Sequence, residues 1–208
     1  MLDNAPRREY SGALLSLTFS PDGARNAYTA SYGALCVDGK WISGGGFGRF
    51  SPDSRSFVCR CGNHVAINGR AEPEYAAVGD FVFLPGGKTI AYTAQSKEGQ
   101  VFVVVDGKER AGIPGESPGA PVPSPDGKHF AYVMRKPTQW GPAVTIEPGH
   151  TQQRSLPARY LVAIDGQPGP ECEEVIPHGP TWQSDGSLEY LIRNEGVLYR
   201  VRHLPTAE

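Results

Sequence analysis

The sequence has few segments that are free of both glycine and proline. Its 208 residues include 26 glycines and 19 prolines, and the longest segment without either spans 11 residues, Lys88–Glu98. Both residues disfavour helix interiors, and an average helix already needs about 11 to 12 residues. The composition therefore excludes a protein built on long helices. It favours an all-β fold, which often reaches this length as one domain.

Long apolar runs are missing as well. No apolar run exceeds five residues, as in Val101–Val105, whereas a membrane-spanning helix needs about 20. The first ten residues include Arg7, Arg8 and Glu9 and do not resemble a secretory signal peptide. We expect no membrane insertion and a cytoplasmic protein as the chain stands. A periplasmic or secreted location would require that a leader had been removed.

Neither sign of charge is in excess. Lys and Arg total 20 and Asp and Glu total 22, which gives a net charge of −2. Nucleic-acid-binding domains normally carry a basic patch and a basic balance of charge. We therefore expect no nucleic-acid partner.

Cysteine is scarce, and neither cysteine nor histidine has the spacing of a metal site. The pair Cys59 and Cys61 alternates as on a strand, with both side chains on one face, unlike the Cys-x-x-Cys of zinc and redox sites. The five histidines give no zinc signature either. We expect no cofactor and no metal. The four cysteines, Cys36, Cys59, Cys61 and Cys172, occupy positions that other repeats fill with packing residues, which indicates reduced core thiols.

A short turn motif occurs five times and divides the chain into repeats. The copies are Phe19–Gly23 (FSPDG), Phe50–Ser54 (FSPDS), Phe83–Gly87 (FLPGG), Pro123–Gly127 (PSPDG) and Trp182–Gly186 (WQSDG). A residue of a kind that is usually buried lies nine positions after the first residue of the motif in four copies and eight positions after it in the fifth. These residues are Tyr28, Cys59, Tyr92, Tyr132 and Tyr190.

Each of the first four repeats contains a second turn. These turns are Val37–Lys40 (VDGK), Ile67–Arg70 (INGR), Val105–Lys108 (VDGK) and Ile164–Gln167 (IDGQ). Asp-Gly and Asn-Gly supply the positive φ angles of tight hairpins, and the intervening segments are rich in β-branched and aromatic residues. Each repeat is therefore predicted to be a four-stranded antiparallel blade.

Five such blades predict a five-bladed β-propeller. The first residues of the motifs are 31, 33, 40 and 59 positions apart, and blades of this type average roughly 40 to 45 residues. The predicted blades span about 15–43, 48–78, 80–113, 120–176 and 180–204, in a single domain. The last has only three strands, and Arg8–Gly12 resembles Glu72–Ala76, the predicted fourth strand of blade two. Residues 8–14 are therefore predicted to close the ring as the missing strand.

These motifs resemble the WD40-like repeat of TolB, the tricorn protease and the propeller domains of prolyl-oligopeptidase relatives. The resemblance covers essentially the whole chain and implies a propeller that binds partners at its loop-rich face and channel mouth. The chain differs from those families in lacking an appended hydrolase domain and a TolB-like N-terminal domain, and it has fewer blades than they usually have.

The clearest irregularity is an insertion of about 22 residues in blade four, Pro137–Ala158. Unstructured loops longer than about 12–15 residues are usually functional or disordered. The insertion carries Trp140, His150 and Arg154, and Trp and Arg are favoured interface anchors. The alternative is a loop or extra hairpin that packs on its own protein or in an oligomer contact.

Further candidates lie where one blade crosses to the next, on the variable face where function is expected. They are Phe47, Arg49, Asp80 and His178, with Asn63 and His64 at the tight loop of blade two. The alternative is that they cap strand ends and face solvent.

We therefore predict a non-catalytic binding module for a protein or peptide, with a glycan or small ligand as further options. The rival is a metal-dependent hydrolase or lyase using Asp80, His178 and Arg49 at the channel mouth.

Overall fold

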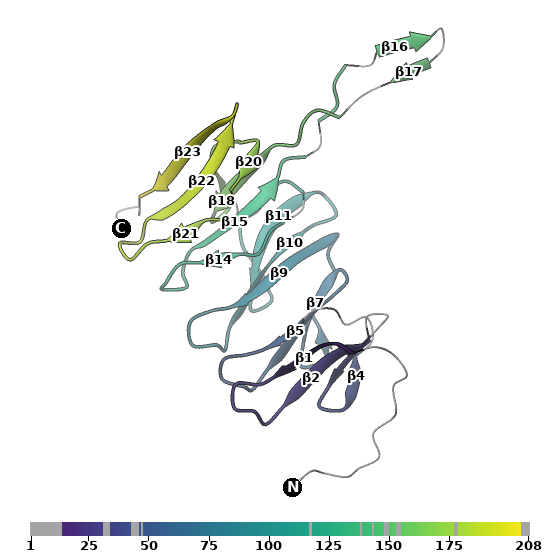
Figure 1. The fold of residues 1–208 in the computed structure, drawn as a ribbon, viewed down its shortest axis with the longest axis vertical. Helices are drawn as coiled ribbons and strands as arrows, with labels where there is room; N and C mark the ends of the chain where they lie inside the picture. The colour runs from purple at the N-terminus through teal and green to yellow at the C-terminus, as the bar shows by residue number, and fades with distance from the viewer. Residues whose placement is uncertain are drawn as a thin grey trace. The chain divides into compact units, whose positions relative to one another are not determined.

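The protein is built from β-strands throughout the part that the structure describes. The computed structural model describes residues 14–30, 34–42, 46, 48–116, 118–137, 139–142, 144–147, 150–152, 155–176 and 179–204. Every regular element within these ranges is a strand (Figure 1). The same ranges contain no helix with the length and apolar character needed to cross a membrane.

The chain divides into two compact units, which are described separately. The first takes the described residues up to Glu74 together with Gly86–Thr89, and the second takes Tyr75–Pro85 and the described residues from Ile90 onward.

Two four-stranded antiparallel sheets form the first unit. The first sheet has the order β1-β2-β3-β4 and the second the order β5-β6-β7-β8. The strands are β1 (Leu14–Phe19), β2 (Asn26–Ala30), β3 (Ala34–Val37), β4 (Lys40–Ile42), β5 (Gly48–Phe50), β6 (Phe57–Cys61), β7 (His64–Ile67) and β8 (Arg70–Ala71). Their shared core includes Leu35, Phe50, Phe57 and Cys59.

Three further sheets form the second unit. In the third sheet the order is β12-β11-β10-β9, and β13 also pairs with β11. In the fourth the order is β14-β15-β18-β19, and in the fifth β22 pairs with β20, β21 and β23. The strands of the third sheet are β9 (Ala77–Phe83), β10 (Ile90–Gln95), β11 (Gln100–Val105), β12 (Lys108–Glu109) and β13 (Ile113–Pro114). Those of the fourth and fifth are β14 (Val122–Pro123), β15 (Phe130–Arg135), β18 (Tyr160–Ile164), β19 (Gln167–Pro168), β20 (Glu174–Val175), β21 (Thr181–Trp182), β22 (Leu188–Asn194) and β23 (Val197–His203).

The insertion in the fourth repeat contains a hairpin of its own. Strands β16 (Val144–Glu147) and β17 (His150–Gln152) pair as a separate two-stranded sheet between β15 and β18. The pairing agrees with the extra hairpin named in the alternative reading of the insertion, while its packing on the protein or in an oligomer contact stays a prediction.

In four of the five repeats, all but the third, the first turn is stabilised by a serine and an aspartate. The hydroxyls of Ser20 and Ser51 donate to Asp22 and Asp53, both at 2.6 Å, and Ser187 donates to Asp185 at 2.6 Å. These hydrogen bonds to the ionised form lower the pKa of each aspartate. The recurrent aspartates therefore form turns, as the repeat predicts.

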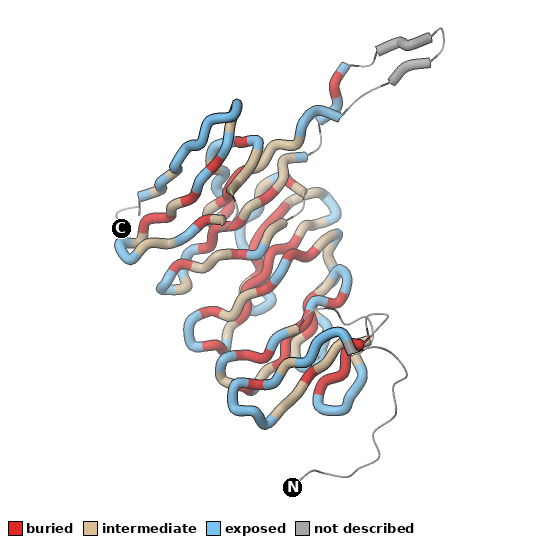
Figure 2. The backbone as a smooth tube through the Cα atoms, in the orientation of Figure 1, coloured by how far each residue is buried: buried red, intermediate tan, exposed pale blue. Residues whose placement is uncertain are grey.

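The cores consist of the central strands of neighbouring sheets within each unit. Tyr92 and Tyr132, at the repeated tyrosine position, are completely buried, and so is Cys59, which replaces tyrosine in the second sheet. In Figure 2 buried residues follow the strands, while the turns between them are mostly exposed. All four cysteines are buried, as their place in the repeat predicts.

The prediction of an all-β chain made of repeated antiparallel sheets is confirmed. The pairings within the described residues give five main sheets and the small hairpin sheet, with no closed sheet among them. Leu14, the last residue of the predicted closing strand 8–14, instead begins β1 and lies opposite Ala30 in the first sheet. Residues 8–13 lie outside the described residues, so closure of a ring by them stays a prediction.

Candidate functional site

A groove of about 750 Å³ lies between the two sheets of the first unit. Ligand sites commonly have volumes of about 300–1,000 Å³, so the groove is large enough for a small molecule or a peptide segment. Its polar lining consists of Arg25, Asp38, Lys40, Arg55, His64 and Asn68. Its apolar lining consists of Val37, Trp41, Ile42, Phe57, Cys61, Ala66, Gly69 and Ala71.

The second turn of the first sheet positions one wall of the groove. Asp38 and Gly39 have φ angles of 50° and 79°, and this tight turn reverses the chain directly into β4. Strand β4 brings Lys40 and Trp41 to the groove. The Trp41 ring meets the Tyr28 ring edge-on, with centroids 5.7 Å apart, and remains 39% exposed. An exposed indole that is fixed on one side is a suitable contact for a ligand.

Positive side chains outnumber carboxylates in the lining of the groove. The Arg25 guanidinium pairs with Asp38 at 2.8 Å, donates to the Arg55 carbonyl at 2.9 Å and lies 5.1 Å from the centre of the Phe50 ring. Of the described residues that line the groove, Asp38 alone is a carboxylate. Because Arg25 neutralises it, the exposed side chains of Lys40 and Arg55 leave the groove with a net positive charge.

Two cysteines meet at the floor of the groove. The sulfur atoms of Cys59 and Cys61 are 3.3 Å apart, and Cys61 lines the groove together with His64, its partner across strands β6 and β7. The hydrogen bond from the Cys59 thiol lowers the pKa of Cys61, against the opposing effect of burial. The charge of His64 and the Gly46 backbone N–H contribute in the same direction. The same hydrogen bond raises the pKa of Cys59, and burial raises it further.

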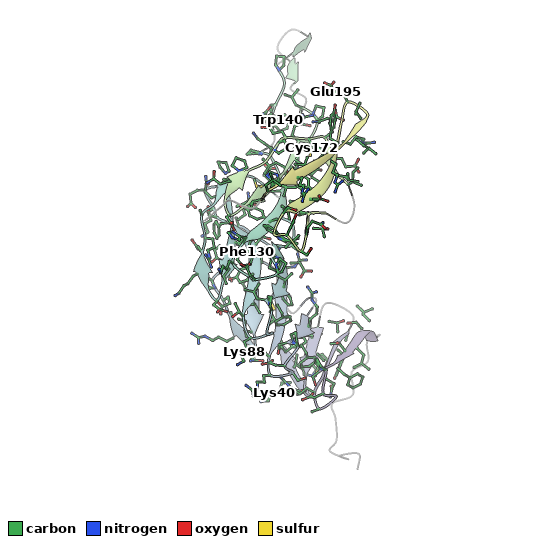
Figure 3. All side chains as sticks on the ribbon, turned by 90° about the vertical axis from the view of Figure 1, so that its left-hand side faces the viewer. Lys40, Lys88, Phe130, Trp140, Cys172 and Glu195 are labelled. Atoms are coloured by element: carbon green, nitrogen blue, oxygen red, sulfur yellow. The ribbon has the colours of Figure 1, made fainter. Side chains whose placement is uncertain are left out.

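The predicted residues of the insertion are only partly described. Trp140, labelled in Figure 3, lies opposite Ser155 in an isolated antiparallel bridge. The residue is 62% exposed. His150 begins β17, and Arg154 lies outside the described residues. The structure thus places Trp140 where a partner can reach it, and the binding role of the three residues stays a prediction.

The other predicted residues lie in different units or outside the described residues. Arg49 lies exposed on β5 in the first unit, and Asp80 lies exposed on β9 in the second, where its Oδ1 accepts the Phe81 N–H at 2.8 Å. Phe47 and His178 lie outside the described residues. The described residues also contain no group of three His, Cys, Asp or Glu side chains arranged to hold a metal ion. The rival metal site therefore stays a prediction.

Sequence reasoning missed the groove, although it singled out His64. Lys40 stands in the same Asp-Gly-Lys turn as Lys108, and nothing in the turn motif separates them. The distinguishing signal is the next residue, which is Trp41 in the first repeat and Glu109 in the third. An exposed aromatic in place of a charged residue, next to a lysine, is the one feature that marks the groove.

Comparison with known proteins gives similarity to solved structures alone. No protein-family model matches the chain, and no curated protein matches it. The hydrazine synthase of Kuenenia stuttgartiensis is 16% identical, with 86% of this chain and 64% of that chain covered and a TM-score of 0.47. This chain therefore spans just under two thirds of that protein.

Two other similar structures have comparable scores. A putative 6-phosphogluconolactonase from Bacteroides uniformis is 14% identical, with coverages of 92% and 70% and a TM-score of 0.42. The Dos1 propeller is 9% identical, with coverages of 86% and 52% and a TM-score of 0.46. Since every one of these TM-scores is below 0.5, the similar structures carry no argument about the fold. The fold is described from the strand pairings of this chain alone.

Proposed function

We propose that the protein is a non-catalytic binding module whose groove in the first unit recognises an acidic, extended segment of a partner protein. The observation that carries the proposal is the combination of Lys40, Arg55 and the exposed Trp41 ring in one groove of about 750 Å³. No catalytic step is part of this function.

The charges favour an acidic partner. Lys40 and Arg55 are exposed, and Arg25 already holds the carboxylate of Asp38, so the groove attracts carboxylates although the chain as a whole has a net charge of −2. Charge complementarity of this kind raises association rates and discriminates against basic partners.

The shape and the apolar lining favour a peptide over a single small anion. The groove is lined by residues of β4 on one sheet and of β7, which begins at His64, on the other, and its lining combines polar and apolar side chains. Trp41 offers an aromatic contact of the type that dominates peptide recognition.

Two broader predictions belong to the same proposal. The five sheets form a closed five-bladed ring, with residues 8–13 as the fourth strand of the last blade. The exposed Trp140 of the insertion makes a second contact with a protein partner. The repeat pattern of the sequence supports the first, and the exposure of Trp140 supports the second.

The test measures binding of labelled peptides by fluorescence anisotropy. The probe is a short peptide that alternates glutamate with leucine and phenylalanine, and its counterpart carries lysine in place of every glutamate. We expect the acidic peptide to bind and Trp41→Ala to weaken it about tenfold. Lys40→Glu should weaken it about two- to fivefold, since single exposed charges contribute up to about 1 kcal/mol.

The repeat offers a matched control. Lys108 occupies the same turn position in the third sheet, is exposed and does not line the groove, so Lys108→Glu makes the same change of charge elsewhere. Equal weakening by Lys40→Glu and Lys108→Glu would contradict the proposal, because it would reflect overall charge. Equal binding of the acidic and basic peptides would contradict it too, and so would competition by inorganic phosphate alone at the same concentration.

A further inference from the structure

We propose that Cys59 and Cys61 are a peroxide-sensitive dithiol that closes to a disulfide at the floor of the groove. This inference goes beyond the proposed function and does not depend on it, because its test follows the thiols and uses no peptide.

The geometry brings the two sulfur atoms together. Both side chains project from the same face of β6, as residues two apart on a strand must, and their sulfur atoms are 3.3 Å apart. Two steps along a strand separate the Cα atoms by about 6.6 Å, close to the upper end of the range that disulfides span. Cys61 is the last residue of β6 and the tight turn at Gly62 follows, so a small local shift of one residue is sufficient.

The two cysteines differ in access and in acidity. Cys61 lines the groove, which a hydroperoxide can enter, while Cys59 lies behind it with no exposed surface. The Cys59 thiol and the charge of His64 lower the pKa of Cys61, so Cys61 is the better nucleophile near neutral pH. Cys59 keeps its proton and is placed to attack second.

The chemistry requires a hydroperoxide as oxidant and balances in two steps. Cys61 loses its proton, and its thiolate attacks one oxygen of hydrogen peroxide, so that the O–O bond breaks and Cys61 becomes a sulfenic acid. The hydroxide that leaves takes up a proton, equal to the one that Cys61 lost, and becomes water. The Cys59 sulfur then attacks the Cys61 sulfur, the S–O bond breaks, and the released hydroxide takes up the Cys59 proton as water. Overall two thiols are oxidised to one disulfide, and the peroxide is reduced to two molecules of water.

The chain contains a matched control in Cys172. This thiol is also buried, but it donates to the Tyr160 carbonyl at 3.4 Å, and burial raises its pKa. A buried thiol whose pKa is raised reacts slowly with peroxide. Cys172 therefore reports what burial alone does to a cysteine of this fold.

Arg60 makes the experiment direct, because trypsin cleaves between the two cysteines. Digestion separates Ser56–Arg60 from Cys61–Arg70, and these peptides stay joined only if the disulfide has formed. The folded protein is treated with hydrogen peroxide at pH 7, the remaining thiols are blocked by alkylation, and the digest is analysed by mass spectrometry. We expect the joined pair at two hydrogens below the summed mass, lost again on reduction. Cys61 should be consumed about tenfold faster than Cys172.

Two variants separate the steps. In Cys59→Ala, Cys61 has no neighbouring thiol, so its sulfenic acid should persist and be trapped by dimedone. In Cys172→Ala, the joined peptides should form at an unchanged rate. The peptide map of the unaltered protein decides the matter even if a variant fails to fold.

Three results would overturn the proposal. The first is oxidation of Cys61 to the sulfinic acid in the unaltered protein without any joined peptides. The second is consumption of Cys172 at the same rate as Cys61. The third is full survival of all thiols in the folded protein under conditions in which the unfolded protein is oxidised.

Discussion

The carboxylate of Asp165 accepts the backbone N–H of Phe130 at 2.9 Å and so ties the second turn of the fourth sheet to the start of its second strand. The same relationship recurs between Asp38 and Asn26 at 3.0 Å and between Asn68 and Phe57 at 2.9 Å. The residue at this position needs a side-chain oxygen that accepts the backbone N–H and a backbone with positive φ, which is 50° at Asp165. Asp and Asn satisfy both requirements, which explains their recurrence before glycine.

Replacement of Asp165 tests this relationship. Asp165→Ala removes the acceptor and places alanine at positive φ, so we expect the free energy of unfolding to fall by about 1–2 kcal/mol. Asp165→Asn keeps the oxygen and tolerates the φ angle, so its loss should stay within about 0.5 kcal/mol. Urea unfolding followed by circular dichroism measures both. The other carboxylate oxygen of Asp165 lies 2.7 Å from Nδ1 of the exposed His129 side chain. Equal losses in the two variants would show that this pair, and not the backbone contact, is what matters.

The first turns predict how stability depends on pH. The Ser124 hydroxyl and the Lys128 N–H donate to Asp126 at 2.5 and 3.1 Å, and these bonds lower its pKa below the ordinary 3.8. Since the folded pKa lies below the unfolded one, the contribution to stability is present above pH 3.8 and is lost as the pH falls through the folded pKa. We expect stability to stay level from about pH 5 to 7 and to fall below about pH 4.

Ser124→Ala isolates one of these turns. Without the serine hydroxyl, the pKa of Asp126 should rise toward its ordinary value, while that of Asp22 in the first unit should not change. A carboxyl titration by nuclear magnetic resonance follows both groups in one experiment. An unchanged pKa of Asp126 would mean that the serine is not its principal hydrogen-bond donor.

The repeated turns could be predicted from the sequence because their cause is local. A Ser-x-Asp turn and an Asp-Gly turn need only residues within a few positions, and the strands between them follow from hairpin geometry. The burial of Cys59 could be predicted because it occupies the repeat position at which the other copies have tyrosine.

The groove could not be predicted in the same way. It depends on how the two sheets of the first unit pack against each other, and this packing involves segments that are distant in sequence. Lys40 and Lys108 look alike in the sequence, and only the fold puts the first in a groove. The 3.3 Å approach of Cys59 to Cys61 likewise depends on side-chain orientations that strand alternation leaves open.

Trp140 tests the predicted role of the insertion. Its side chain is 62% exposed, so Trp140→Ala should change the free energy of unfolding by no more than about 0.5 kcal/mol, and Tm by less than about 2 °C. Capture of a protein partner from a lysate of the source organism should fall, as expected for an exposed aromatic anchor. A decrease of Tm by several degrees would instead identify Trp140 as a packing residue.

The edge of the fifth sheet tests the predicted closing strand. Strand β23 pairs with β22 over its whole length, from Val197 opposite Asn194 to His203 opposite Leu188, and no other described strand pairs with it. An antiparallel strand directs only alternate N–H groups to one neighbour, so the remaining N–H groups of β23 need a second strand or water. Val197 and Leu198 on this edge are 51% and 61% exposed, and natural proteins rarely leave such an edge open. If residues 8–13 cover the free edge of β23, removal of residues 1–13 should speed amide exchange at every second residue of β23 and leave the N–H groups that face β22 protected. Addition of a peptide with the sequence of residues 6–14 should restore protection. Identical exchange in the full chain and the shortened chain would rule out this closure.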